Sequence, residues 1–228
     1  MPAINPVKKN TDLVLNKTLI INEIFFSIQG ETNLSGLPTI FIRLTGCPLR
    51  CQYCDTAYAF HEGEKLSLLE ILRKIASFRS RHVTVTGGEP LSQKACVDLL
   101  SLLCDEGYQV SLETSGAIDM KNIDERVCKI MDIKTPASEE ADKNNMDNLK
   151  YITAHDQIKF VICDRSDYEW ARDIIHDMQL FERCELLFSP SHEQLDATQL
   201  ADWILTDQLP VRLQIQLHKY LWGDVPGK

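Results

Sequence analysis

The sequence has no long apolar run and no excess of basic residues. Its 228 residues include 24 Lys or Arg and 33 Asp or Glu, which gives a net charge of -9. Proteins that bind nucleic acids need surplus Lys and Arg to contact phosphates, so this balance argues against such a partner. No segment is apolar over the roughly 20 residues of a membrane-spanning helix, and residues 1–20 lack the apolar centre of a signal peptide. We therefore expect a cytoplasmic protein with no membrane or nucleic-acid partner.

Paired cysteines are also scarce, because only one Cys-x-x-Cys pair occurs among the eight cysteines. In a reducing compartment, clustered cysteines indicate metal ligands or catalytic groups rather than disulfides. Three of the eight lie close together, and the other five are spread along the chain. Free Cys is one of the residue types most often buried. We expect each scattered cysteine to be a small buried apolar side chain: Cys96, Cys104, Cys128, Cys163 and Cys184.

Short β-branched runs alternate with segments of helical spacing along the chain. The runs predict strands at residues 19–27, 39–46, 82–88, 108–116, 128–136, 157–163, 184–191 and 211–219. Helical spacing occurs in residues 66–78, in 92–107 with Ser92 as the expected N-cap, in 165–179 and in 192–207. Strand–helix alternation predicts an α/β fold with parallel strands. We expect one domain over residues 1–228, with an N-terminal extension at 1–20 and a C-terminal tail at 219–228.

Several predicted strands finish in small or polar residues. These strand ends comprise residues 86–90, 113–116, 132–135 and 189–191. In a barrel of parallel strands, all carboxyl ends lie on one rim, where ligands bind. We therefore expect the four ends to form a single site. The polar stretch 136–150 reads as a surface loop.

The three clustered thiols belong to Cys47, Cys51 and Cys54, in a segment that follows a predicted strand. A structural zinc site needs four ligands, so a neighbour such as His61 or His82 would have to complete it. A redox dithiol needs two cysteines and leaves the third spare. A cubane iron–sulfur cluster takes one ligand for each of four irons, so three thiolates leave one iron open for an exogenous ligand. The spacing favours the cluster.

Cys-x-x-x-Cys-x-x-Cys followed by Gly-Gly-Glu-Pro at 87–90 resembles the radical S-adenosylmethionine superfamily. The resemblance implies a partial (βα)6 TIM-like barrel, a modified form of the superfamily core. It also implies a [4Fe-4S] cluster whose open iron binds S-adenosylmethionine, and one-electron cleavage to a 5'-deoxyadenosyl radical that abstracts a substrate hydrogen. Gly87 and Gly88 would let the backbone approach the methionine moiety, and Tyr53 offers a flat apolar face for adenine.

Five segments together are similar to the 7-carboxy-7-deazaguanine synthase family. They are residues 21–31, 40–56, 83–90, 113–116 and 213–223. The resemblance implies a carbon–nitrogen lyase that contracts the ring of 6-carboxy-5,6,7,8-tetrahydropterin and expels ammonia, on the route to queuosine and other deazapurines. It implies Mg2+ as a further cofactor, a homodimer, and a reductant such as flavodoxin or ferredoxin.

The resemblance also implies roles for individual residues. The substrate would contact Ile28, Gln29, Gly30, Arg43 and Thr86, and Thr56 would offer its hydroxyl to Mg2+. A guanidinium suits a substrate carboxylate through a bidentate fork, and a hard cation that keeps most of its waters needs few protein oxygens. S-adenosylmethionine would contact Tyr53, Gly88, Ser115, Asp132, Ile133, Lys134, Ser189 and Ser191.

Residues 132–134 depart from the Ser-Pro-Lys of some members, because only the lysine is kept. This departure leaves the local cofactor contacts open.

Two other functions are also consistent with the cysteine motif. One is an activating enzyme that installs a glycyl radical on a partner protein with the same cluster, although such an enzyme would not need the segment at 25–31. The other is a zinc-binding interaction module without catalysis.

Overall fold

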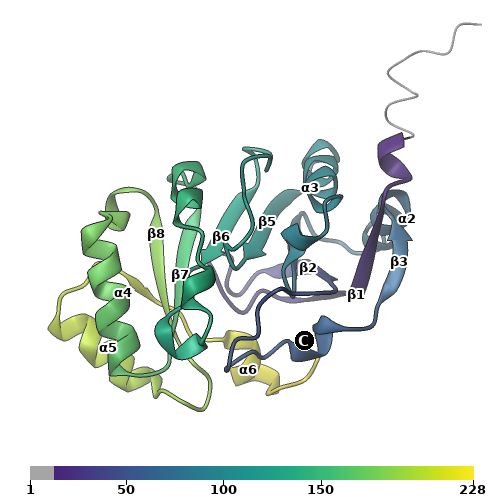
Figure 1. The fold of residues 1–228 in the computed structure, drawn as a ribbon. Coiled ribbons are helices and arrows are strands. Elements are labelled where there is room, and N and C mark those ends of the chain that lie inside the picture. Colours follow the sequence, from purple (N-terminus) through teal and green to yellow (C-terminus); the bar gives the residue numbers. More distant parts are fainter. Residues whose placement is uncertain (1–12) are drawn as a thin grey trace, which may run out of the picture.

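The computed structural model describes residues 13–228, so residues 1–12 of the predicted N-terminal extension lie outside the described part. The described strands form a single sheet in the order β3-β1-β2-β4-β5-β6-β7-β8-β9 (Figure 1). Their bounds are β1 (Thr18–Ile28), β2 (Pro38–Leu44), β3 (Glu64–Ser67), β4 (His82–Gly87), β5 (Gln109–Thr114), β6 (Cys128–Asp132), β7 (Gln157–Ile162), β8 (Glu185–Pro190) and β9 (Arg212–Leu213).

Neighbouring strands from β2 to β9 are parallel, as the strand–helix alternation predicts. The edge differs, because β1 pairs antiparallel with both β2 and β3. Only residues 29–37 join β1 to β2, and a parallel return needs a crossover of about a dozen residues or more. A connection this short therefore gives an antiparallel pair. The short strand β3 was not predicted.

All four predicted helical segments contain a helix: α2 (Leu68–Ile75), α3 (Cys96–Asp105), α4 (Arg165–Asp177) and α5 (Ala197–Thr206). Figure 1 shows α4 and α5 beside β8 at one end of the curved sheet and α2 beside β3 at the other. The predicted N-cap Ser92 is wrong, because it ends a separate 3-10 turn, Pro90–Ser92. Proline fixes φ at the start of this turn, and the Glu89 side chain caps it by accepting from the N–H of Leu91.

Among the described residues, two connections between neighbouring parallel strands lack an α-helix, those from β5 to β6 and from β6 to β7. The second contains the 3-10 turns η3 (Pro136–Ser138), η4 (Ala141–Lys143) and η5 (Met146–Tyr151). The surface loop predicted at 136–150 is therefore built from short turns, and within it Ser138 and Asn148 are fully buried. The sheet is open rather than closed, in agreement with the expected partial barrel.

The predicted strand at 211–219 is also largely wrong. Only Arg212–Leu213 pairs with β8, and the chain then turns into a short helix, α6 (Leu217–Trp222). The alternating apolar pattern of this segment resembles a strand, but several of its apolar side chains are exposed, including Leu213 and Ile215. Without a buried face, the alternation does not extend the sheet.

The two faces of the strands differ in polarity. On β4, Val83 and Val85 belong to the apolar core that the helices cover, whereas Thr84 and Thr86 alternate with them and are also buried. Side chains of a strand point alternately to opposite faces, so the concave interior is lined by polar groups.

Of the five scattered cysteines, Cys96 and Cys163 are buried as expected, and the other three are only partly buried: Cys104, Cys128 and Cys184. Among the described residues, no helix is long and apolar enough to cross a membrane.

Candidate active site

The predicted strand ends meet at one cavity of about 530 Å³. Its walls come from the ends of the parallel strands, where barrel proteins bind ligands, and from the end of β1 and α6. All predicted site residues except Ile133 line it: Ile28, Gln29, Gly30, Arg43, Cys47, Cys51, Tyr53, Cys54, Thr56, Thr86, Gly88, Ser115, Asp132, Lys134, Ser189 and Ser191.

Ile133 does not line the cavity, so its side chain lies away from the other predicted cofactor contacts. Its side chain is fully buried in the apolar core. Side chains alternate in direction along an extended segment, and Asp132 and Lys134 on either side of it do line the cavity. The interior site therefore uses alternate residues of this strand end.

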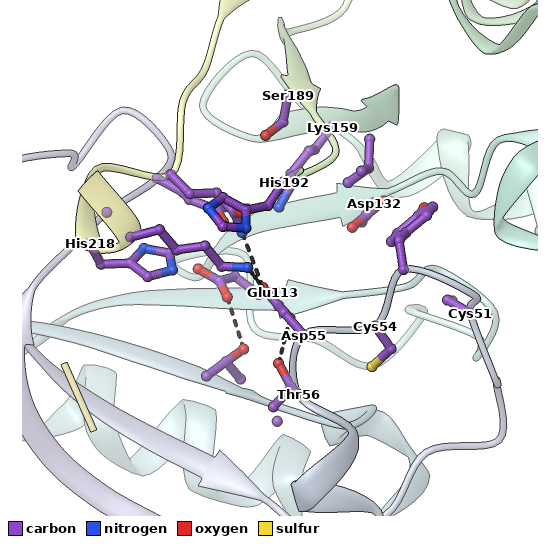
Figure 2. A pocket seen from close by; sticks show the side chains of 18 of the residues that line it. Cys51, Cys54, Asp55, Thr56, Glu113, Asp132, Lys159, Ser189, His192 and His218 are labelled. Carbon is purple, nitrogen blue, oxygen red and sulfur yellow. Dashed lines mark hydrogen bonds and ion pairs between the residues drawn. The ribbon is translucent and has the colours of Figure 1, made fainter. Parts of the chain in front are cut away.

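The three clustered cysteines lie on the loop that follows β2, and Figure 2 shows Cys51 and Cys54 on the side of the pocket opposite His218. All three are free thiols and half-buried. Burial raises the pKa of each, to about 11 for Cys51. Among residues 13–228, no group of three or more His, Cys, Asp or Glu converges closely enough to hold one metal ion. A cubane is much larger than one ion, and three soft thiol donors fit its irons.

Tyr53, Asp132 and Lys134 form a polar wall beside the cysteine loop. Lys134 Nζ lies 3.0 Å from Asp132 Oδ2 and 5.7 Å from the centre of the Tyr53 ring. Burial alone would lower the pKa of Lys134, but the charge of Asp132, its hydrogen bond to Lys134 and the nearby Tyr53 and Cys51 together raise it, so Lys134 is a cation. The Tyr53 hydroxyl and Asp132 Oδ1 are buried with no hydrogen-bond partner among the described residues. Buried polar atoms normally have partners, so this wall fits a ligand that brings both hydrogen-bond donors and acceptors.

Gly87 and Gly88 also allow a close approach within the protein itself. A Cβ at Gly88 would lie 2.3 Å from the carbonyl oxygen of Gly46 and 2.8 Å from Cβ of Cys47. A Cβ at Gly87 would lie 2.2 Å from the carbonyl oxygen of Leu44. The close approach that these glycines permit is therefore to the end of β2 and the cysteine loop. They hold the loop against β4, and both also line the cavity, so their predicted approach to the methionine moiety stays a prediction.

The serines at the strand ends are partly occupied by protein partners. Ser115 donates from its hydroxyl to Glu89 Oε2 at 2.6 Å, and Glu89 is fully buried. Ser191 donates to Gln194 Oε1 at 3.0 Å. Ser189 is buried at the end of β8. Each hydroxyl keeps lone pairs that can accept from a ligand.

A row of hydrogen-bonded polar side chains lines the cavity. Gln29 donates from its amide to Thr84 Oγ1 (3.2 Å) and Glu113 Oε1 (3.3 Å), and its carbonyl oxygen accepts from the N–H of Glu31 (3.2 Å). Thr86 donates to Glu113 Oε2 at 2.8 Å. Both amide hydrogens of Gln29 are thus used within the protein. Burial raises the pKa of Glu113, and the nearby charge of Glu31 raises it further.

Arg43 is held on β2 by a carboxylate and two rings. Its Nε donates to Glu23 Oε1 at 2.7 Å, and the Tyr58 hydroxyl donates to the same oxygen at 2.9 Å. The guanidinium lies 5.7 Å from the ring centres of both Phe25 and Tyr58. Because the ion pair engages Nε, the terminal nitrogens of the fork remain for a ligand carboxylate.

Glu31 and Lys159 form a buried ion pair that sequence reasoning missed. Lys159 projects from β7 and donates to Glu31 Oε2, and Figure 2 shows it near Glu113 and Asp132. Burial alone would raise the pKa of Glu31, but the charge of Lys159 together with hydrogen bonds from Lys159 and Gln216 lowers it. The pair thus carries two full charges into the cavity wall.

Asp55 and Thr56 place a carboxylate next to a hydroxyl. Thr56 Oγ1 donates to Asp55 Oδ1 at 2.7 Å, and Lys219 Nζ lies 3.8 Å from Asp55 Oδ2. Burial alone would raise the pKa of Asp55, but the Thr56 hydrogen bond and the charge of Lys219 lower it to about 2. An ionised carboxylate beside a hydroxyl is an all-oxygen donor pair of the kind that Mg2+ prefers.

Helix α6 covers the cavity between the residues that follow β1 and the residue that follows Cys54. The N–H of Leu217 donates to the carbonyl of Gly30 at 3.0 Å. The Gln216 amide donates to both Glu31 Oε1 (2.9 Å) and Asp55 Oδ2 (3.1 Å). His218 lies against Gly30, where any Cβ would overlap its ring, and burial lowers the pKa of His218.

Comparisons with known proteins agree with this geometry. The model of the radical S-adenosylmethionine superfamily matches residues 41–137. The chain is 42% identical over 208 residues to a 7-carboxy-7-deazaguanine synthase of Chlorobaculum tepidum, covering 90% of this chain and 94% of the relative. It is also 42% identical over 217 residues to that of Koribacter versatilis, covering 89% and 96%. The chain belongs to the 7-carboxy-7-deazaguanine synthase family.

Among solved structures, QueE from Escherichia coli has the same fold. It superimposes with a TM-score of 0.76 over 92% of this chain and 99% of QueE, at 24% identity. As a member of this radical S-adenosylmethionine family, the chain is an enzyme that uses a [4Fe-4S] cluster and S-adenosylmethionine and acts on a small molecule. The comparisons thus favour this family over the zinc module and the glycyl-radical activator.

Several cavity residues of this family member were not predicted: Glu31, Asp55, Glu113, Lys159, Gln216, His218 and Lys219. Two of them carried a local signal. Lys159 is a charge inside an otherwise apolar strand run, and Glu113 alternates with the buried Leu112 on β5. Gln216 and His218 were hidden because their segment was interpreted as a strand.

Proposed function

We propose that this enzyme is a carbon–nitrogen lyase that converts 6-carboxy-5,6,7,8-tetrahydropterin to 7-carboxy-7-deazaguanine with loss of ammonia, on the route to queuosine. One observation carries the proposal. The cysteines, the cofactor wall, the arginine and the threonine implied by the family resemblance line a single cavity, and Asp55 lines it beside that threonine. The relatives of Chlorobaculum tepidum and Koribacter versatilis that bear this activity in their names match nearly the whole chain.

The three cysteines would hold the cluster, and the wall of Tyr53, Asp132 and Lys134 would hold S-adenosylmethionine. When bound, these two groups supply one-electron chemistry that can remove a hydrogen atom from a carbon of the substrate. The orphaned Asp132 Oδ1 and Tyr53 hydroxyl can bind a hydroxyl or ammonium of the cofactor. Lys134 offers a positive charge to a carboxylate. The protein's contribution is orientation, since the cofactor carries the hard chemistry.

The opposite side of the cavity would bind the pterin. Arg43 presents the free end of its guanidinium to the substrate carboxylate, and Glu23 and the flanking rings fix its direction. Glu113 is oriented by Gln29 and Thr86. A carboxyl group with a raised pKa can accept from ring N–H groups or, when protonated, donate to a ring nitrogen. Gln29 acts mainly by holding Glu113, with one carbonyl lone pair left for the substrate.

Magnesium would bind at Thr56 and Asp55. Their hydroxyl and ionised carboxylate supply two hard oxygen donors, and the remaining positions of the ion would be filled by the substrate carboxylate and water. Bound there, Mg2+ would orient that carboxylate. Lys219 and Gln216 keep Asp55 ionised and in place.

We also propose a homodimer, a reductant such as flavodoxin or ferredoxin, and one domain over residues 1–228. A continuous sheet over the described residues supports the single domain. Exposed apolar side chains on and after α6, among them Tyr220, Leu221 and Val225, support a second copy as their cover. Sedimentation equilibrium of the anaerobic enzyme measures the oligomeric state.

The test is an anaerobic assay of the reconstituted enzyme with S-adenosylmethionine, a reductant, Mg2+ and the carboxylated tetrahydropterin. We expect 7-carboxy-7-deazaguanine and ammonia in equal amounts. Cys51→Ala should abolish turnover and cluster loading, whereas Cys104→Ala on α3 should leave both intact. An enzyme with a full cluster that does not consume this pterin would overturn the proposal.

The magnesium site has its own test. Thr56→Ala and Asp55→Asn should each weaken Mg2+ binding. We expect the Mg2+ concentration that gives half-maximal turnover to rise about tenfold. Thr198→Ala, at an exposed position on α5, serves as the control and should leave the metal response unchanged. If both site variants respond to Mg2+ like the wild type, the metal lies elsewhere.

A further inference from the structure

The connection between β6 and β7 holds three parts of the cofactor site together. We call residues 136–148 the brace segment. It stands where a crossover helix is expected, and it contains the 3-10 turns η3 and η4 and the start of η5. Its hydrogen bonds reach the cysteine loop, the end of β6 and the loop after β5. A segment with these contacts can fix their relative positions.

The cysteine loop is the first of these parts. The N–H of Gln52, between the second and third cysteines, donates to the carbonyl of Ser138 at 3.1 Å. The N–H of Arg50 donates to the Glu140 carboxylate. Ser138 is fully buried, and its hydroxyl donates to the carbonyl of Thr135 at 2.6 Å. The brace segment therefore contacts the backbone between the cluster ligands themselves.

The end of β6 is the second part, and Asn144 is the residue that contacts it. Asn144 Oδ1 accepts from the N–H of Lys134 at 2.9 Å, and Asn144 Nδ2 donates to the carbonyl of Lys134 at 2.8 Å. One side-chain amide thus satisfies both backbone groups of a residue that lies beyond the last ladder pair of β6. Such a two-point contact fixes the direction of the Lys134 Cα–Cβ bond.

The loop after β5 is the third part, and Asn148 contacts it in the same way. Asn148 accepts from the N–H of Met120 (3.0 Å) and donates to the carbonyls of Gly116 and Ile118 (2.8 Å each). Asn148 is fully buried. This amide uses both hydrogens and one lone pair to hold the loop that follows Ser115. The two asparagines thus set the strand ends on either side of the cofactor wall.

Lys134 is the group on which this arrangement acts. Its ammonium is oriented by Asp132 at 3.0 Å and lies near the face of Tyr53. Asn144 does not line the cavity, and both hydrogen bonds of its side chain go to the Lys134 backbone. Its effect on a ligand must therefore pass through Lys134.

We propose that Asn144 is a positioning residue for S-adenosylmethionine, because it fixes the Lys134 backbone so that the Lys134 ammonium faces the cofactor. The proposal rests on the assignment of Lys134 to the cofactor wall in the proposed function. It predicts a loss of cofactor affinity, and it predicts no change in pterin affinity. A purely structural Asn144 would instead lower thermal stability and leave the affinity of the folded enzyme unchanged.

The experiment uses the reconstituted holoenzyme under anaerobic conditions. S-adenosylmethionine is titrated while the electron paramagnetic resonance spectrum of the reduced cluster is recorded, which gives a Kd without turnover. We expect Asn144→Ala to raise this Kd about tenfold, equivalent to about 1.4 kcal/mol, with a matching rise in KM for S-adenosylmethionine and an unchanged KM for the pterin. Asn144→Asp keeps the acceptor for the Lys134 N–H but loses the donor to its carbonyl, and it should give a smaller rise of about threefold.

Asn145→Ala is the matched control, because Asn145 makes no side-chain cap to η5 and neighbours Asn144. Its Kd should equal that of the wild type. The proposal is overturned if Asn144→Ala keeps the wild-type Kd, or if Asn145→Ala shows the same rise. If the wild-type spectrum does not respond to S-adenosylmethionine at all, the proposed function fails first. A wild-type response with an unaffected Asn144→Ala enzyme refutes only the role of Asn144.

Discussion

Replacing Gly88 by alanine is expected to displace the cysteine loop. A Cβ at this position would lie 2.3 Å from the carbonyl oxygen of Gly46 and 2.8 Å from Cβ of Cys47. The first of these neighbours is backbone, so no rotamer change relieves the overlap. The N–H of Gly88 also donates to Leu44, and that of Glu89 donates to Gly46 at 2.8 Å. The loop can move away from β4 only by stretching these hydrogen bonds.

The structure sets the size of the effect. The Gly46 oxygen must retreat by about 0.7 Å to reach 3.0 Å, below which real Cβ contacts essentially never occur. Overpacking of this kind costs about 1–3 kcal/mol of unfolding free energy. A displacement approaching 1 Å near reacting groups lowers a rate by about 100-fold. We therefore expect a modest loss of stability and a large loss of turnover.

The assay compares iron and sulfide per chain, thermal unfolding and product formation for Gly88→Ala and the wild type after anaerobic reconstitution. The control is Gly36→Ala, since a Cβ there meets nothing within 4 Å and the residue has only a strained φ of +90°. The control should lose some stability and keep its cluster and its activity. A Gly88→Ala enzyme with a full cluster and wild-type turnover would refute the close-packing argument.

Three further predictions concern the cavity wall and the framework. Glu31→Gln should lower the free energy of unfolding by about 3–5 kcal/mol, because it leaves Lys159 as an unpaired buried charge. The double variant Glu31→Gln, Lys159→Met should recover part of this loss. Chemical denaturation measures both. The same pair predicts a pH dependence. Burial raises the pKa of Glu31 but Lys159 lowers it overall, so the stability it confers is fully present above pH 4.5, its unfolded value, and is lost as pH falls through the lowered pKa. The gap between wild type and Glu31→Gln should therefore narrow below pH 4.5, and a constant gap would contradict this. Ser67→Ala removes the capping box of α2, in which Ser67 and Glu70 bond reciprocally. It should cost about 1 kcal/mol, or about 2–4 °C in Tm, without affecting turnover, and an unaltered Tm would show that the cap is dispensable.

The parts of the fold that local patterns encode were predictable from the sequence. Local patterns include the alternating apolar residues of β4 and β7 and the helical spacing of apolar residues in α2. Each pattern marks the side of one element that packs into the core. The cysteine spacing and the polar strand ends indicated one cavity, because parallel strands bring their carboxyl ends together whatever the details of packing. Asp132 and Lys134 reached the cavity for this reason, and strand alternation also explains why Ile133 did not.

Contacts between distant segments were not predictable in the same way. Gln216 meets Asp55 across 161 positions, and Lys159 meets Glu31 across 128. The sequence around each of these residues does not indicate its partner. The alternating apolar residues at 211–219 indicated a strand, but several of these side chains do not pack against the rest of the protein and stay exposed. The segment at 136–150 is rich in polar residues like a loop, yet its asparagines satisfy backbone groups of its neighbours.

The mouth of the cavity joins early and late parts of the chain. Gln216 reaches Glu31 across 185 positions, and Leu217 reaches Gly30 over a similar span. Closing so long a loop costs entropy that only the finished sheet can offset, so such contacts form late. A growing chain therefore has its strands paired while the pocket is still open on this side. We therefore expect the cluster and its ligand to enter more easily before α6 docks than after it.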